Sequence, residues 1–278
     1  MKQKIGIIAL DLDGTLLDSN KKLSEKNYAA LQKAAEAGIE IVPTTGRFYG
    51  ALPESIKNLP FLHYAITING AQAVDVRSGE VIYSAELPWQ QTVELMELFD
   101  TLPVIYDCYQ ENEAYMPAAQ KALINEIAPD KHYIKMLHEL RQPVEDLKSY
   151  LSEKKKGVQK VQFFTKDIAL RDKLLNELPQ KYDDLSVTCS LVNNLEINQI
   201  HANKGEALAA LARYLNLPET ATMSFGDGLN DISMLKSAGI GVAMANALQP
   251  CKDVADYVTL SNDEDGVAAA IEKFCFGE

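Results

Sequence analysis

Two aspartates, Asp11 and Asp13, stand directly after an apolar run near the start of the chain, and Gly14 and Thr15 follow them. The run, residues 5–10, has the length and the continuous apolar character of a strand that is buried on both faces. One polar residue would suffice to end such a strand, whereas two carboxylates one residue apart concentrate negative charge there. A divalent cation neutralises such a pair, so the run predicts metal-assisted chemistry on an oxygen-rich substrate.

Three further polar clusters lie where strands of an α/β sheet are expected to end. They are Thr44-Thr45-Gly46-Arg47, Asn203-Lys204-Gly205 and Gly226-Asp227-Gly228-Leu229-Asn230-Asp231. Ligands of an open α/β sheet bind outside the carboxyl ends of its strands, so these clusters and the first one would meet in one site. The aspartates offer hard oxygen ligands for Mg²⁺, and Thr45, Lys204 and Asn230 offer donors for phosphate oxygens. Each cluster alone is equally a turn or a helix start, and only their combination is specific.

Strand and helix patterns alternate at both ends of the chain. At the start, strands are predicted at residues 5–10, 39–42 and 64–68, with a helix at 24–37. Ser24 is the expected N-cap of that helix and Gly38 its stop. After residue 202 the prediction is helix 204–216, strand 222–225, a helix up to 238, strand 240–243 and helix 264–274. Such alternation is typical of an α/β sheet whose loops gather at the carboxyl ends of its strands.

The middle of the chain has a different pattern. Residues 74–83 predict a hairpin that turns at Ser78 and Gly79. Helices are then predicted at 88–100, 144–155 and 167–178, and strands at 104–109, 158–164 (alternating, hence half-exposed), 185–190 and 195–199. We therefore predict an α/β fold, with a Rossmann-like core in which helices flank a parallel sheet. Residues 1–83 and 198–278 would form this core, and residues 84–197 an inserted α+β domain.

Composition restricts the possible partners. The chain has 278 residues, of which 47% are hydrophobic, and a formal net charge of −12 from 39 acidic and 27 basic residues. This acidic balance argues against nucleic-acid or anionic-membrane binding, so an anionic substrate must be held by local groups. The four cysteines are far apart, and the apolar stretches are too short for a signal peptide or a membrane span. We expect a cytoplasmic protein, as a monomer or weak homodimer.

Together the four clusters resemble the motifs of the haloacid dehalogenase (HAD) superfamily, whose commonest members are phosphatases. The insertion between the second and third motifs, with Ile68-Asn69-Gly70-Ala71 before it and Gly241-Val242-Ala243-Met244-Ala245-Asn246-Ala247 near the end, resembles the Cof-type (class IIB) branch. That branch carries a large α/β cap. The resemblance covers essentially the whole chain; the core motifs are specific, whereas the inserted domain matches only in position, length and pattern. Asn203 stands where the branch often has Ser or another small residue.

The resemblance implies a role for each motif residue. Asp11 would be the nucleophile, and Asp13 would protonate the leaving oxygen and then activate water. Mg²⁺ would be bound by Asp11, Asp227 and the backbone carbonyl of Asp13. The phosphate would be held by Leu12, Thr45, Gly46, Lys204 and Asn230. Asp231 would orient Lys204 or a metal-bound water, and Arg47 and Asn69 are possible substrate contacts.

These roles describe a Mg²⁺-dependent phosphatase for small phosphorylated metabolites, either sugar phosphates or phosphorylated cofactors, that acts through an aspartyl-phosphate. Two alternatives stay open: a phosphomutase-like transfer enzyme, and a non-catalytic regulator phosphorylated on Asp11. The water-activating role of Asp13 favours hydrolysis, although mutases of the superfamily share this residue. The inserted domain would close over the site and select the leaving group; its candidate contact residues are Asp107, Tyr109, Tyr115 and His132.

Overall fold

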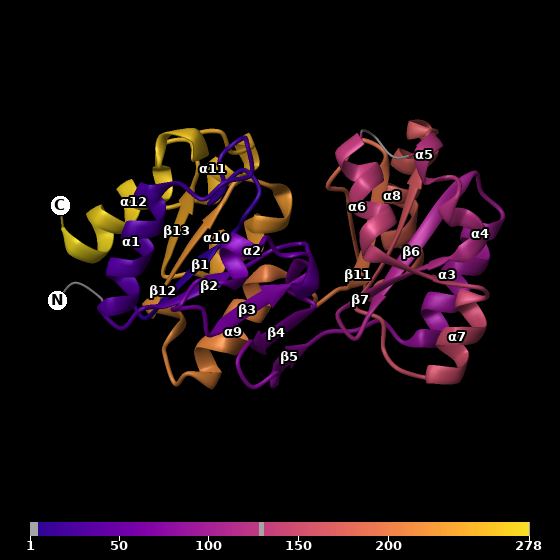
Figure 1. Ribbon diagram of the computed structural model, residues 1–278, viewed down its shortest axis with the longest axis horizontal. Helices are drawn as coiled ribbons and strands as arrows, with labels where there is room; N and C mark the ends of the chain where they lie inside the picture. Colours follow the sequence, from indigo (N-terminus) through magenta and orange to yellow (C-terminus); the bar gives the residue numbers. More distant parts are fainter. Residues whose placement is uncertain (1–4, 128–130, 278) are drawn as a thin grey trace. The chain divides into compact units, whose positions relative to one another are not determined.

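The computed structural model describes residues 5–127 and 131–277, and in helix α6 (Lys131–Leu140) it describes the side chains from Ile134 onward. The chain divides into two compact units. Unit 1 joins the chain up to Ser84 with the chain from Ala202 onward, and unit 2 is Ala85–His201. Figure 1 shows the elements of both units along the sequence.

The centre of unit 1 is a five-stranded parallel sheet, as the alternating pattern predicts. Its strands, in spatial order, are β14 (Tyr257–Val258), β13 (Ile240–Ala243), β12 (Thr222–Gly226), β1 (Ile7–Leu10) and β2 (Glu40–Pro43). Strand β1 therefore lies between β12 and β2, although more than 200 residues separate it from β12 along the chain. Because these three strands are parallel, their carboxyl ends lie at the same edge of the sheet.

Helices cover both faces of this sheet, because successive residues of a strand point to opposite sides. Ile8 and Leu10 pack in a core with one helix pair, and Ile7 and Ala9 pack in a second core with the other. The first pair is α1 (Glu25–Glu36) and α12 (Gly266–Ile271), and the second is α9 (Lys204–Tyr214) and α10 (Ile232–Ser237). The result is a three-layered unit, which Figure 1 shows with the sheet between the helices.

Helix α1 starts and stops where the sequence predicts. The Ser24 hydroxyl accepts a hydrogen bond from the backbone N–H of Asn27 at 3.1 Å, which satisfies a donor of the first turn. Gly38 follows the helix with φ of +83°, a conformation that glycine adopts without steric cost. The last predicted helix, residues 264–274, is only partly α-helical. Helix α12 covers Gly266–Ile271, and the π-helical turn η6 (Glu272–Phe276) follows it directly.

The predicted third strand joins a different sheet. Strand β3 (Tyr64–Thr67) pairs antiparallel with β4 (Gln72–Asp75), which pairs with β5 (Val81–Ser84), and only two parallel bridges connect the β3 segment to β2. The tight turn η2 (Ile68–Gly70) reverses the chain immediately after β3 and so brings β4 back beside it. Shorter helical segments complete unit 1: η1 (Tyr49–Ala51), α2 (Glu54–Lys57), η3 (Glu219–Ala221), η4 (Leu229–Asp231), α11 (Gln249–Val254) and η5 (Asn262–Glu264).

Unit 2 is built on a six-stranded, largely antiparallel sheet. In spatial order its strands are β10 (Leu185–Thr188), β11 (Asn194–Gln199), β9 (Lys160–Thr165), β6 (Val104–Gln110), β7 (Glu113–Pro117) and β8 (Arg141–Val144). Helices α3 (Trp89–Asp100), α7 (Leu147–Lys154) and α8 (Ile168–Lys181) pack on one face in a single apolar core. Side chains of α5 (Ile124–Ile127) and α6 pack against part of the other face, and α4 (Ala118–Lys121) precedes them.

Two predictions in unit 2 are wrong in detail. Strand β9 is buried throughout, not half-exposed, because its polar residues Lys160 and Gln162 make buried contacts with Glu196 and Asp107. The helix predicted from residue 144 begins only at Leu147, since residues 141–144 pair with β7.

Candidate active site

The loops that follow β1, β2 and β12 lie next to one another, because these strands are neighbours in the sheet. Strand β1 is also the point at which the order of strands reverses: β2 lies on one side of it, and β12 and β13 on the other. A crevice forms at such a switch point, outside the carboxyl ends of the strands. The polar clusters that follow β1, β2 and β12 therefore share one location in unit 1.

Lys204 connects the first, third and fourth clusters. Its Nζ lies 2.6 Å from Asp11 Oδ1 and 2.6 Å from Asp231 Oδ1, and the lysine side chain is fully buried. Burial lowers the pKa of Lys204, but the two carboxylates outweigh this effect and raise it, so the lysine is a fixed cation. The lysine occupies the first turn of α9, where the Asn203 side chain caps the helix by accepting a hydrogen bond from Glu206 N–H at 2.9 Å.

Asp227 is held by its neighbours in the loop after β12 and in the loop after β1. Its Oδ1 accepts a hydrogen bond from the Thr15 hydroxyl at 2.7 Å. Asp231 Oδ2 accepts the backbone N–H groups of Asp227 and Gly228, each at 2.8 Å, which closes the loop. A Cβ on Gly14 would lie 2.5 Å from Asp227 Oδ2, so this close approach requires glycine.

Three carboxylates in this cluster could hold a metal ion. Asp11, Asp227 and Asp231 each offer an oxygen within 4.8 Å of the others. Burial, together with the neighbouring carboxylates, raises the pKa of Asp11 to about 8, while burial is the main cause that raises the pKa of Asp227 to about 6. A divalent cation relieves this cost because it favours the ionised form of each ligand. The all-oxygen donor set fits Mg²⁺.

Asp13 has a different environment from Asp11. Arg47 contacts both of its oxygens through Nε at 2.9 Å and Nη2 at 2.7–2.8 Å, and Lys21 Nζ lies 2.9 Å from Oδ1. Partial burial raises the pKa of Asp13, but Arg47 and Lys21 outweigh it and hold the pKa below its usual value. Asp13 is therefore paired with cations, whereas the three carboxylates that could hold a metal share Lys204 and Thr15, although the charge of Asp13 also raises the pKa of Asp227.

The predicted phosphate-binding residues are connected through Asn69. This residue has φ of +59°, donates its backbone N–H to Thr45 O at 3.0 Å, and accepts a hydrogen bond from Asn230 Nδ2 at 3.2 Å. A Cβ on Gly46 would lie 2.7 Å from Asn69 Oδ1. The Leu12 side chain is buried in the core, so only the backbone of Leu12 could contact a phosphate. The site residues predicted from the four motifs, together with Asn69, all lie in unit 1.

Sequence reasoning missed two partners in the site. Thr15 lies within the first motif, and its type and position could have indicated a hydrogen bond to a metal ligand. Lys21 gives no comparable signal, because it is one of two adjacent lysines in a polar turn. Its position beside Asp13 becomes visible only in the folded chain.

The candidate residues of the inserted domain have structural partners in unit 2. Asp107 is fully buried and accepts hydrogen bonds from Arg141 Nε at 2.9 Å and Gln162 Nε2 at 2.8 Å. The Tyr109 hydroxyl accepts a hydrogen bond from Arg141 Nη2 at 2.8 Å, and the Tyr115 ring packs against Tyr150. The side chain of His132 lies outside the described residues. These contacts within unit 2 fit a structural role for Asp107, Tyr109 and Tyr115 as well as they fit the predicted substrate contacts.

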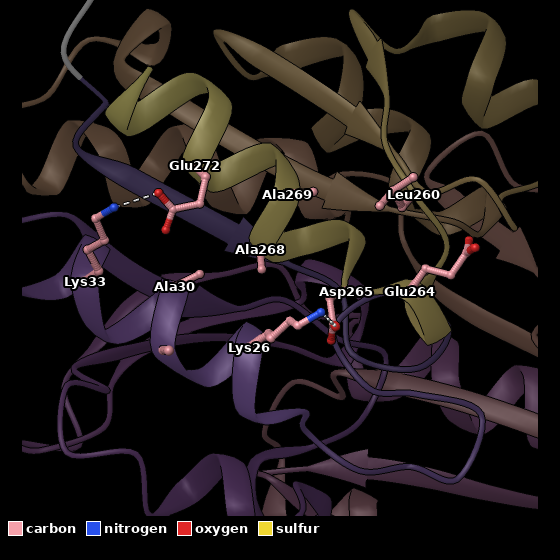
Figure 2. Close-up of a pocket in the computed structure, with 10 residues that line it drawn as sticks. Lys26, Ala30, Lys33, Leu260, Glu264, Asp265, Ala268, Ala269 and Glu272 are labelled. Atoms are coloured by element: carbon pink, nitrogen blue, oxygen red, sulfur yellow. Dashed lines mark hydrogen bonds and ion pairs between the residues drawn. The ribbon is translucent and has the colours of Figure 1, made fainter. Parts of the chain in front are cut away.

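A surface groove lies elsewhere on unit 1, between α1 and the segment that contains η5 and α12 (Figure 2). Alanines of the two helices form part of its lining. Four of its charged residues form two ion pairs: Lys33 Nζ lies 2.7 Å from Glu272 Oε2, and Lys26 Nζ lies 3.4 Å from Asp265 Oδ2. The groove contains none of the predicted site residues. Among the described helices of both units, none is long and apolar enough to cross a membrane.

Comparison with known proteins identifies the class of enzyme that this site belongs to. A family model described as haloacid dehalogenase-like hydrolase matches residues 8–271. A crystal structure of a haloacid dehalogenase-like hydrolase from Bacteroides thetaiotaomicron superposes with a TM-score of 0.81 at 31% identity, covering 97% of this chain and 99% of that one. The chain therefore belongs to the haloacid dehalogenase superfamily.

Two relatives from Bacillus subtilis define the branch. Phosphatase YwpJ is 30% identical over 287 residues, covering 94% of this chain and 97% of the relative. The 5-amino-6-(5-phospho-D-ribitylamino)uracil phosphatase YcsE is 31% identical over 271 residues, covering 96% and 94%. The protein is a phosphatase of the Cof type.

Proposed function

We propose that the protein is a Mg²⁺-dependent phosphatase that hydrolyses small phosphorylated metabolites through an aspartyl-phosphate on Asp11. One observation carries the proposal: the two aspartates have different partners. The buried Asp11 shares Lys204 with Asp231 within a carboxylate cluster, whereas Asp13 is paired with Arg47. These different environments allow two different roles for the two aspartates, with Asp11 as the nucleophile and Asp13 as the general acid and base.

The proposed reaction has two steps. In the first, an Asp11 oxygen forms a bond to phosphorus, the ester P–O bond breaks, and Asp13 gives a proton to the leaving oxygen. In the second, Asp13 takes a proton from water as the water oxygen attacks phosphorus and releases Asp11. Mg²⁺, bound by Asp11, Asp227 and the backbone carbonyl of Asp13, would reduce the repulsion between carboxylate and phosphate and polarise the phosphoryl oxygens.

The other site residues would bind and orient. Thr45, Asn230, Lys204 and the backbone N–H groups of Leu12 and Gly46 would hold the phosphoryl oxygens, where transition-state charge accumulates. Asp231 would fix Lys204 through the 2.6 Å contact. Arg47 and Asn69 would contact the substrate.

The substrate class is proposed as sugar phosphates or phosphorylated cofactors. The relative named for 5-amino-6-(5-phospho-D-ribitylamino)uracil supports small organic phosphates, since that name describes a phosphorylated ribityl chain. Residues 84–197 would act as a cap that excludes water and selects the leaving group. A cytoplasmic location, and a monomeric or weakly dimeric state, are also part of this proposal.

The test is phosphate release from a panel of phosphorylated metabolites. We expect turnover with Mg²⁺, none after chelation, and a loss of at least about a thousandfold in Asp11→Asn, because the nucleophile is removed. Asp253→Asn, on helix α11, is the matched control and should retain activity. Equal activity in Asp11→Asn would refute the nucleophile assignment. Transfer of phosphate to added alcohols or sugars, without release to water, would favour the mutase alternative.

A further inference from the structure

Two cations contact the single carboxylate of Asp13. Lys21 Nζ lies 2.9 Å from Oδ1, and the Arg47 guanidinium contacts both oxygens at 2.7–2.9 Å. One negative and two positive charges leave this group with one positive charge in excess, in a chain with a net charge of −12. The group around Lys204 has the opposite charge balance, one negative charge in excess, because a single lysine pairs with both Asp11 and Asp231.

Lys21 is held in place by its turn. The Asp18 side chain accepts the backbone N–H groups of Asn20 at 2.9 Å and Lys22 at 2.8 Å, and Lys21 itself has φ of +62°. A lysine in this left-handed conformation carries backbone strain, which persists only where the surrounding structure enforces it. Ser19 anchors the turn to Asp263 through its backbone N–H at 2.8 Å and its hydroxyl at 2.6 Å.

Arg47 is fixed as well, and the group remains accessible. Besides its contacts with Asp13, Arg47 donates from Nη1 to Ala51 O at 3.3 Å. The exposed fractions are 50% for the Lys21 side chain, 26% for Arg47 and 34% for Asp13. A ligand at Asp13 can therefore reach both cations.

We propose that Lys21, together with Arg47, binds an anionic group on the leaving side of the substrate. This inference rests on the proposed function, in which Asp13 lies within hydrogen-bond reach, about 3 Å, of the ester oxygen. Because both cations contact the same carboxylate, they lie within about 8 Å of that oxygen, whichever Asp13 oxygen faces it. The substrate class is therefore phosphate monoesters that carry a carboxylate or second phosphate a few bonds from the ester oxygen.

The experiment compares esters that differ in this group alone. One pair is phosphoglycolate and 2-hydroxyethyl phosphate, and a second is 3-phosphoglycerate and glycerol 3-phosphate; in each, a hydroxymethyl group replaces the carboxylate. We expect the Mg²⁺-loaded wild type to favour the acidic ester in kcat/KM. Lys21→Met should lower this preference about tenfold, mainly through KM, as expected for the loss of one charged contact. Lys21→Arg should keep most of the preference, and Lys22→Met, on the same turn, should keep all of it.

The outcomes separate this inference from the proposed function. An unchanged preference in Lys21→Met would overturn the role of Lys21. A wild type that hydrolyses neutral esters but favours neither acidic ester would overturn the substrate class while leaving the phosphatase proposal intact. Absence of phosphate release from every ester of the wider panel would instead contradict the proposed function.

Discussion

Asp11 and Asp13 are two residues apart, yet they experience opposite electrostatic environments. Asp11 is 7% exposed, and burial together with Asp231 and Asp227 raises its pKa to about 8 despite Lys204. Asp13 lies against Arg47 and Lys21, which outweigh its partial burial and lower its pKa. Residues i and i+2 of an extended segment would share a face, but the chain turns at Leu12, directly after β1, and the two carboxylates have different partners. In the metal-free protein these shifts oppose the proposed roles, because a nucleophile must be ionised and an acid protonated. Mg²⁺ would favour the ionised form of Asp11, and a substrate anion that takes up Arg47 and Lys21 would raise the pKa of Asp13.

These pKa shifts predict how stability depends on pH and metal. Asp11 and Asp227 have pKa values of about 8 and about 6, above the ordinary 3.8. Between pH 3.8 and about 8 these two groups thus bind more protons in the folded, metal-free protein than in the unfolded chain, so their contribution to the free energy of unfolding falls as pH rises. Mg²⁺ requires ionised ligands and removes this cost. We expect saturating Mg²⁺ to raise Tm by about 5 °C more at pH 8 than at pH 5, measured by calorimetry.

Asp11→Asn serves as the control for this pH dependence. It removes the carboxyl with the largest upward shift in this cluster, so the metal-free variant should lose less stability between pH 5 and pH 8 than the wild type. The lowered pKa of Asp13 acts only below its ordinary value of 3.8, outside this window. An Mg²⁺ effect on Tm that is equal at both pH values would contradict the assignment of these carboxylates as metal ligands.

Part of the site could be predicted at the residue level and part could not. Asp11, Thr45 and Asp227 each follow an apolar run, and strand ends of a parallel sheet meet at one edge, so their proximity follows from pattern alone. Lys21 is beside Asp13 because of the Asp18 turn and the link between Ser19 and Asp263. That link joins residues 244 positions apart, and no local pattern encodes it.

At the scale of elements, the turn η2 and the start of helix α9 approach each other closely. A Cβ on Gly70 would lie 2.2 Å from Asn203 O and 2.7 Å from the backbone nitrogen of Lys204. Gly70 also has φ of +93°. This contact sets the position of the first turn of α9, which carries Lys204 into the carboxylate cluster.

Gly70→Ala should therefore reduce both stability and activity. The matched control is Gly79→Ala, because Gly79 has a similar φ of +78°, but a Cβ there would meet no atom of the described residues within 4 Å. The control should cost about 1–2 kcal/mol, the penalty of a left-handed alanine. Gly70→Ala should cost at least about 2 kcal/mol more, because backbone atoms must move. Urea denaturation measures both, and equal losses would show that the close contact is unimportant.

Strands β8 and β9 of unit 2 show why some elements could not be predicted correctly from the sequence. Strand β8 is four residues long, contains Pro143 and lies at the edge of the sheet, the position where proline is tolerated. Strand β9 alternates polar and apolar residues as a half-exposed strand would, but Lys160 pairs with Glu196 at 3.2 Å and both are buried. The alternation of polar and apolar residues shows which face of a strand is polar. It cannot distinguish a face exposed to water from a buried face whose polar side chains bind one another.

At the scale of the whole molecule, the site belongs to one unit. Asp11, Asp13, Lys204, Asp227 and Asp231 all lie in unit 1, although unit 2 separates them along the chain. Metal binding should therefore stabilise unit 1 directly, by an amount that grows with the logarithm of the Mg²⁺ concentration, about 2.7 kcal/mol at one hundred times Kd.

Hydrogen exchange can measure where this stabilisation acts. At pH 8, we expect saturating Mg²⁺ to slow amide exchange in β1 and β12 about a hundredfold, in proportion to the added stability. Strands β6 and β9 are the internal control, because they form the centre of the sheet in unit 2, which offers none of these ligands. Their exchange should change by less than about threefold, if local opening of each unit dominates. Equal protection of both sheets would mean that the two units open together, and protection of neither would contradict metal binding at the carboxylate cluster.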